Sequence, residues 1–252
     1  MPNTTKTILI TGATSGIGEA LAKLYASNHA RLLLIGRNVE RLNSVAAACK
    51  KQGATVITAT IDVREKQTLH DWIVQNDSEQ SIDLVIANAG IAKTQARREV
   101  KDAMEVDQMI FDVNLQGVLN TIHPIITAMQ KRKSGQIAVV SSLAAFINGT
   151  SFAAYSASKA AVKTYSLALR TFLKADKIKV NTICPGYVVT PLIKGKEFTP
   201  FFPMNVEKAA KIIKRGLNRN KTLIAFPRMT YWSCRLYLML PVWLQERLSK
   251  TI

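Results

Sequence analysis

Short apolar runs alternate with amphipathic helical patterns along most of the chain, and this alternation constrains the fold more than any other feature. The first two runs are Thr7–Thr11 and Arg31–Ile35, and neither alternates between polar and apolar residues. Strands of this kind are buried on both faces, and helices between them make a parallel sheet. We therefore expect a single-domain, Rossmann-like α/β fold over residues 1–252, with a doubly wound parallel sheet of about seven strands flanked by helices.

The same patterns predict the order of the elements. Strands are expected at Thr7–Thr11, Arg31–Ile35, Thr55–Ile61, Ile82–Ala87, Gln136–Ser141, Lys179–Cys184 and Thr222–Ala225. Helices are expected at Ile17–His29, Val39–Lys51, Leu69–Val74, Ala103–Met129, Ala153–Leu173 and Val206–Leu217. We expect a cofactor half at about 1–135, a catalytic and substrate half at about 136–226, and a basic apolar tail at about 227–252. Ligands of such sheets bind beyond the carboxyl ends of the strands.

A glycine-rich turn follows the first predicted strand and opens the first predicted helix. Its spacing is G-x-x-x-G-x-G, which lets the backbone approach a pyrophosphate, and the helix N-terminus then attracts the negative charge. We assign cofactor contacts in this turn to Gly12, Thr14, Ser15, Gly16, Ile17 and Gly18.

The second strand is followed by Gly36, Arg37 and Asn38, where an NAD-binding chain usually has an acidic residue for the ribose. A guanidinium instead suits a 2′-phosphate, so Arg37, with Asn38, favours NADP(H). Further strand ends carry Asp62-Val63 and Asn88-Ala89-Gly90, candidates for cofactor contacts that by themselves are more typical of turns.

The fifth predicted strand ends at two serines, and Tyr155 lies thirteen positions after Ser142. On a helix Tyr155 and Lys159 share one face, and an ammonium beside a phenol lowers the phenol's pKa. Tyr155 is then a candidate proton donor and acceptor, and Ser142 a candidate group to orient the substrate oxygen.

Together, the glycine turn, N-A-G, the serine, Y-x-x-x-K and a later P-G resemble the short-chain dehydrogenase/reductase family over about Lys6 to Thr190. The resemblance implies that Tyr155 is the general acid/base and that Lys159 lowers its pKa and holds the nicotinamide ribose. It further implies that Ser142 positions the substrate oxygen and that Asn114 completes a proton relay. The choice of Ser142 over Ser141 rests on the family spacing alone.

The resemblance also implies cofactor roles for residues outside the catalytic set. Asp62 lies at the adenine, Asn88 braces the central sheet, and the segment Pro185, Gly186, Val188 and Thr190 lies against the nicotinamide. The implied activity is hydride transfer between NADP(H) and a carbonyl or alcohol of a small molecule, by a homodimer or homotetramer. Phe198, Phe201 and Phe202 resemble part of the family's substrate lid and indicate an apolar substrate, although they serve equally well as core anchors.

Two other classes of function stay open. A non-catalytic nucleotide-binding sensor or scaffold would share this fold, but it has no use for the intact Ser142, Tyr155 and Lys159. The net charge of +17 suggests nucleic acid, yet no groove-reading motif appears, so we expect no specific nucleic-acid partner. No ligand spacing for a metal occurs, and we expect none.

The cysteines and the two ends of the chain bear on where the protein works. Cys49, Cys184 and Cys234 are far apart and odd in number, so we expect reduced, buried thiols in a cytoplasmic protein without a signal peptide. The tail interleaves Tyr and Trp with Arg, is too short to span a bilayer, and contains Pro241, which divides any helix there. It either binds a membrane surface peripherally or packs against the substrate pocket or a second subunit.

Overall fold

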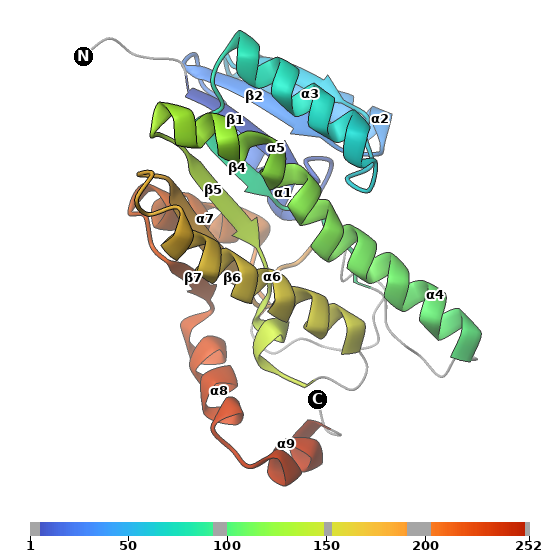
Figure 1. The fold of residues 1–252 in the computed structure, drawn as a ribbon. Helices are drawn as coiled ribbons and strands as arrows, with labels where there is room; N and C mark the ends of the chain where they lie inside the picture. The colour runs from blue at the N-terminus through green and yellow to red at the C-terminus, as the bar shows by residue number, and fades with distance from the viewer. Residues whose placement is uncertain (1–5, 93–99, 149–152, 191–202, 250–252) are drawn as a thin grey trace.

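A computed structural model describes residues 6–92, 100–148, 153–190 and 203–249 of the chain. At its centre is one seven-stranded sheet with the order β3-β2-β1-β4-β5-β6-β7, and all neighbouring strands are parallel (Figure 1). The strand order reverses between β1 and β4, which is where doubly wound folds bind their ligands. The predicted Rossmann-like α/β fold is confirmed.

The strands are β1 Lys6–Thr11, β2 Ala30–Ile35, β3 Thr55–Ala59, β4 Leu84–Ala87, β5 Gln136–Val140, β6 Lys179–Pro185 and β7 Leu223–Phe226. The helices of the sheet layers are α1 Gly16–Tyr25, α2 Val39–Lys51, α3 Lys66–Glu79, α4 Val100–Phe111, α5 Gly117–Arg132, α6 Ala153–Phe172 and α7 Val206–Asn218. Two short irregular helices, a π-turn at Asp112–Gln116 and a 3-10 turn at Leu143–Phe146, lie between them. The tail forms α8 Arg228–Leu238 and α9 Val242–Ser249.

Helices cover both faces of the sheet because successive strand residues point to opposite sides. In β1, Ile8 and Ile10 belong to the core under α1, α2 and α7, whereas Leu9 belongs to the core under α3, α5 and α6. Figure 1 shows α3, α5 and α6 in front of the sheet, with α7 behind it. The central strands are therefore mostly apolar on both faces, as the sequence pattern indicated.

Several predicted boundaries are wrong. The first helix ends at Tyr25 rather than at His29, since β2 already begins at Ala30. The segment Leu69–Val74 lies in a helix as predicted, but that helix, Lys66–Glu79, is longer than expected. Its apolar stripe is narrow, since only Leu69, Ile73 and Asn76 of it are buried, and the pattern therefore understates its length. The long helix predicted at Ala103–Met129 is two helices joined by the π-turn.

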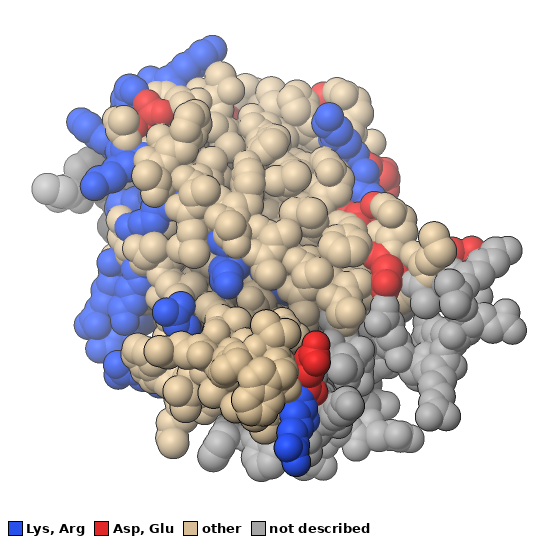
Figure 2. All heavy atoms as spheres, turned by 60° about the horizontal axis from the view of Figure 1, so that its bottom comes forward, with Lys and Arg blue, Asp and Glu red and all other residues tan. Residues whose placement is uncertain are grey.

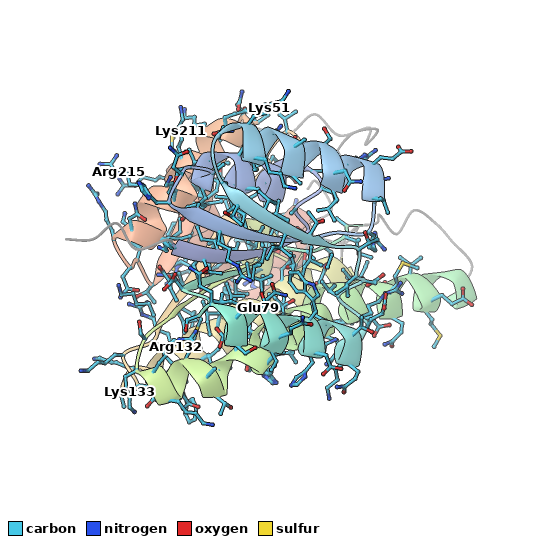
Figure 3. All side chains as sticks on the ribbon, turned by 90° about the horizontal axis from the view of Figure 1, so that it is seen from above. Lys51, Glu79, Arg132, Lys133, Lys211 and Arg215 are labelled. Carbon is cyan, nitrogen blue, oxygen red and sulfur yellow. The ribbon has the colours of Figure 1, made fainter. Side chains whose placement is uncertain are left out.

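Positive charge is spread over helix ends. The last turns of α2, α5 and α7 carry Lys51, Arg132 and Arg215. Figure 3 shows Lys51 and Arg215 at the outside of the molecule, whereas Arg132 is paired with Asp77 at 2.9 Å. Cations at a helix C-terminus oppose the partial negative charge of its free carbonyl groups. Part of the net charge of +17 thus stabilises helices, and this part is no evidence for an anionic ligand.

Two further expectations from the sequence, one for the tail and one for the cysteines, agree with the structure. Pro241 separates α8 from α9, and all three cysteines are buried and unpaired, as predicted. No helix within the described ranges combines the length and the apolar content needed to cross a bilayer. Phe198, Phe201 and Phe202 lie outside the described residues.

The carboxyl ends of β1 and β4 are joined by Thr11 and Asn88. Thr11 Oγ1 accepts hydrogen bonds from the amides of Asn88, at 3.1 Å, and Ala89, at 3.2 Å. Asn88 Nδ2 donates to the carbonyl oxygens of Thr11, at 3.0 Å, and Gly12, at 3.2 Å. The bracing role of Asn88 that the family resemblance implies is thus visible in its contacts, and Thr11 is a partner that the sequence analysis missed.

Thr11→Val should destabilise the fold by about 2 kcal/mol, because the amides of Asn88 and Ala89 lose their acceptor. Urea unfolding followed by circular dichroism measures the change. Thr7→Val, on the same strand, is the matched control: the Thr7 hydroxyl is buried and has no hydrogen-bond partner among the described residues, so its removal should be neutral or stabilising. Equal losses for the two variants would contradict the role of Thr11.

Candidate active site

The glycine turn lies tightly on the end of β4. Gly12 has φ +66, and a Cβ there would lie 2.9 Å from both Ala89 Cα and Asn88 Nδ2. A Cβ at Gly18 would lie 2.2 Å from the Gly12 carbonyl oxygen. Only glycine fits these two positions. The turn leads into α1, whose N-cap residue Ser15 makes no side-chain capping bond, so the first amides of the helix stay available to an anion.

Residues from two other strand ends reach the same turn. A Cβ at Gly16 would lie 2.9 Å from Thr190 Cγ2, which places the segment after β6 against the start of α1. A Cβ at Gly36 would lie 2.3 Å from Thr14 Cγ2. The predicted cofactor residues Thr14, Gly16 and Thr190 therefore lie together at the carboxyl edge of the sheet.

Two guanidinium groups flank the Asp62 carboxylate beside this turn. Arg64 Nη2 lies 2.8 Å and Arg37 Nη1 3.6 Å from Asp62 Oδ2. The hydrogen bonds from Arg64 and, more weakly, the charge of Arg37 hold the pKa of Asp62 below its ordinary value. Arg64 was missed in the sequence, where it directly follows Asp62-Val63. Asn38 caps α2 by accepting from the Arg41 amide at 2.8 Å, so its side chain has a structural partner.

Some predicted cofactor residues have their side chains in the protein interior. Val63 and Val188 are buried, and Ile17 and Ala89 are partly buried against the two main cores. Val63 and Val188 can therefore contact a cofactor mainly through the backbone. Pro185 ends β6, and its carbonyl oxygen accepts from Ser142 Oγ at 3.5 Å. The amide of Gly186 donates to the Phe226 carbonyl at 2.7 Å.

Asn114 lies in the π-turn between α4 and α5 and is fully buried. Its Oδ1 accepts from the Ile91 amide at 2.8 Å, and its Nδ2 donates to the Ile91 carbonyl at 2.9 Å and to Ser158 Oγ at 3.1 Å. π-turns within helices are common at functional sites, and this one holds Asn114 against α6. Ser158 in turn donates to the Tyr155 carbonyl at 2.8 Å.

Ser142, rather than Ser141, faces Tyr155. The Ser142 and Tyr155 hydroxyls share a hydrogen bond, and Ser142 Oγ accepts from the Ala144 amide at 3.1 Å. Ser141 is buried and donates to the Lys159 carbonyl at 2.7 Å. The geometry agrees with the choice that family spacing suggested.

Lys159 is buried and donates to the Val140 carbonyl at 3.0 Å. Burial lowers its pKa to about 8. Its Nζ lies 5.9 Å from the centre of the Tyr155 ring. A Cβ at Gly90 would lie 3.2 Å from both Lys159 Nζ and Asn114 Oδ1, so this glycine leaves room for the two side chains to meet.

The pKa of Tyr155 differs from our expectation. Burial raises it, and the hydrogen bond with Ser142 opposes this rise. The expected lowering by Lys159 does not appear, because the Lys159 ammonium is directed at the Val140 carbonyl. In this geometry Tyr155 is a neutral phenol at neutral pH and therefore a proton donor.

The chain matches the family model of the short chain dehydrogenases over residues 6–199. An uncharacterised oxidoreductase of Myxococcus xanthus is 32% identical over 94% of this chain and 93% of its own length. A fatty acyl-CoA reductase of Acinetobacter baylyi is 33% identical over 87% of this chain and 75% of its own. The chain belongs to the short-chain dehydrogenase/reductase family. It is an oxidoreductase with the NAD(P)-binding fold of that family.

Solved structures agree on the fold. A short-chain dehydrogenase/reductase of Mycobacterium marinum has a TM-score of 0.78 and 27% identity over 88% of this chain and 92% of its own. A short-chain dehydrogenase of Sphingobium yanoikuyae in complex with NADPH has a TM-score of 0.82 and 23% identity over 98% and 96%. One of Mycobacterium paratuberculosis bound to NAD has a TM-score of 0.76 and 23% identity over 89% and 96%. These three chains share the fold of this protein along most of its length.

Lys159→Met should raise the free energy of unfolding at pH 7 by about 2 kcal/mol. The variant no longer buries an ammonium, and this gain exceeds the loss of the hydrogen bond from Lys159 to the Val140 carbonyl. Since folding lowers the pKa of Lys159 from 10.5 to about 8, the unfolded chain binds the proton more tightly. Wild-type stability therefore rises with pH across this interval, and the advantage of the variant disappears towards its upper end. Urea titrations at several pH values test this, with the exposed Lys174→Met as control; an advantage independent of pH would contradict it.

Proposed function

We propose that the protein is an NADP(H)-dependent oxidoreductase that moves a hydride between the nicotinamide and a carbonyl or alcohol of an apolar small molecule. The observation that carries the proposal is the hydrogen bond of Tyr155 to Ser142, with Lys159 and Asn114 held beside it at the edge where the glycine turn lies. Such a set of groups has a use only if a proton is transferred there.

The residues present fit a dinucleotide. Gly12 and Gly18 allow a close backbone approach, and the uncapped start of α1 suits a pyrophosphate. We expect Thr190, Pro185 and Gly186 to line the nicotinamide side, and Lys159 to hold its ribose. The bound nicotinamide supplies or accepts the hydride.

The charges around Asp62 support a preference for NADP(H) over NAD(H). Arg37 and Arg64 outnumber the single carboxylate of Asp62 that lies between them, and Gly36 stands where an acidic residue would bond the ribose of NAD. Arg37 keeps 62% of its side chain exposed and is bound to Asp62 only at 3.6 Å, so it is available to a 2′-phosphate.

Tyr155 donates its hydroxyl proton to the substrate oxygen during reduction and recovers one afterwards. Ser142 holds that oxygen and stabilises its negative charge. Lys159, ammonium for the most part at pH 7, would stabilise the phenolate that Tyr155 leaves behind once its Nζ turns from the Val140 carbonyl toward the phenol oxygen. Asn114 acts through Ser158 and the Ile91 backbone as a positioning residue for this end of α6.

An apolar substrate is supported by the turn after Ser142, which consists of Leu143, Ala144, Ala145 and Phe146, and by the name of the fatty acyl-CoA reductase among the relatives.

Three unpaired thiols favour a reducing compartment, and we propose a cytoplasmic location. The homo-oligomer that the family resemblance implies stays a prediction.

Tyr155→Phe should abolish ketone-dependent oxidation of NADPH and leave the Kd for NADPH within about twofold, since the phenol hydroxyl moves the proton and bonds no phosphate. The decrease in absorbance of reduced nicotinamide over a panel of ketones measures the first, and fluorescence titration the second. Tyr165→Phe, on the same helix but bonded to His123, should keep wild-type turnover. Near-normal kcat in Tyr155→Phe would remove it from the acid/base role.

Arg37→Ala should raise the Kd for NADPH by about tenfold and leave that for NADH unchanged, because a hydrogen bond to a charged group contributes about 1.5–3 kcal/mol. Arg41→Ala, at an exposed arginine in the first turn of the helix α2 that follows Arg37, should change neither. If NADPH and NADH weaken equally, Arg37 does not read the 2′-phosphate.

A further inference from the structure

Helices α8 and α9 carry a concentration of exposed apolar side chains. Of the thirteen large apolar residues that are exposed among the described residues, eight lie within residues 229–248. We call tail face the group formed by Met229, Trp232, Leu236, Met239, Val242 and Trp243. Its first four members are spaced three, four and three apart and so share one side of α8 and its end.

The opposite side of α8 is fixed to the protein. Cys234 and Tyr237 are buried, and the ring of Tyr231 packs edge-on against Phe146 with a centroid separation of 5.7 Å. α9 is held as well, since Tyr237 Oη donates to the Gln245 carbonyl at 3.2 Å and Asn148 Nδ2 donates to Gln245 Oε1 at 2.9 Å. The tail thus has an inner face that belongs to the core and an outer face that is held toward solvent.

We propose that the tail face docks on the surface of an anionic lipid bilayer. Trp232 and Trp243 are exposed by 62% and 65%, and indole rings are favoured at the headgroup level of membranes. The exposed Arg228, Arg235 and Arg247 accompany them, and long cationic side chains reach lipid phosphates while their stems lie on apolar surface. Figure 2 shows this end of the molecule as a protruding, mostly uncharged surface with charged side chains at its margin.

Charge separates this partner from a second copy of the chain. The two tail helices contain three arginines and one acidic residue, Glu246, and the whole chain carries +17. Two copies meeting through the tail face would bring these like charges together, whereas an anionic bilayer complements them. An apolar face of helices that lies flat in the headgroup region needs no membrane-spanning length.

Docking would also orient the substrate side of the protein. The inner face of α8 packs on the 3-10 turn Leu143–Phe146, which directly follows Ser142. A bilayer on the outer face therefore lies on the same end of the molecule as this turn. This orientation rests on the proposed function: it places an enzyme for apolar substrates where such substrates dissolve.

Co-sedimentation of the full-length protein with vesicles tests the proposal without any turnover. The vesicles are of phosphatidylcholine alone or of equal parts phosphatidylcholine and phosphatidylglycerol. The protein should bind the mixed vesicles more strongly, and added salt should weaken that binding in part. Trp232→Ser/Trp243→Ser should lower the partition coefficient by about tenfold or more, because two indoles no longer leave water.

Phe172→Ser is the matched control, since Phe172 is 71% exposed but lies on α6. It should bind vesicles like the wild type. Thermal unfolding of the double variant verifies its fold, and sedimentation without vesicles gives the mass of each protein. The proposal is overturned if the wild type does not bind the anionic vesicles, or binds both kinds equally. It is also overturned if the double variant binds unchanged, or loses oligomer mass while keeping its vesicle binding, since the tail face then belongs to a second copy.

Discussion

The contact between the ends of β1 and β4 is the constraint on which the rest of the site depends. Asn88 and Thr11 satisfy four backbone groups of two neighbouring strands, at the point where the strand order reverses. The turn that follows Thr11 can then lie directly on Ala89 only because Gly12 and Gly18 have no side chains. A buried amide without a hydrogen-bond partner costs free energy, so an arrangement that breaks the bonds of Thr11 and Asn88 is unfavourable. These hydrogen bonds and the two glycines together therefore specify one conformation of the turn.

The reacting groups are organised by backbone contacts in a similar way. Lys159 is directed by the Val140 carbonyl, Asn114 by the two backbone groups of Ile91, and Ser142 by the Ala144 amide. Burial then acts on the ionisable pair in opposite directions, raising the pKa of Tyr155 and lowering that of Lys159. Both shifts favour the neutral forms, which is the expected effect of burial. At pH 7 only the shift of Lys159 costs stability, because Tyr155 is neutral in the folded and in the unfolded chain.

Local patterns explain what was predictable from the sequence. Apolar runs identified the strands, and the glycine turn, Ser142, Tyr155 and Lys159 are recognisable because their spacing is set within a strand end or a helix. The π-turn at Asp112–Gln116 could not be recognised in the sequence, since one wider helical turn hardly changes the spacing of the apolar residues. Arg64 was missed because its pairing with Asp62 depends on how the two side chains are oriented, which the sequence does not show. The direction of the Tyr155 pKa was missed because the sequence does not say where the Lys159 ammonium points.

The tail shows why composition and position must be considered together. Its sequence allowed either a core segment or a membrane segment. The structure has a buried inner face and an exposed outer face, with Tyr237 inward and Leu236 outward on consecutive positions of one helix. Elsewhere, positive charge at Lys51, Arg132 and Arg215 lies at helix ends, where it stabilises the helix that carries it. The three arginines of the tail are different because they accompany exposed indoles. Positive charge points to a binding partner only where exposed apolar side chains lie beside it, because their burial then adds to the binding free energy. Among the described residues, such side chains are concentrated on the tail face.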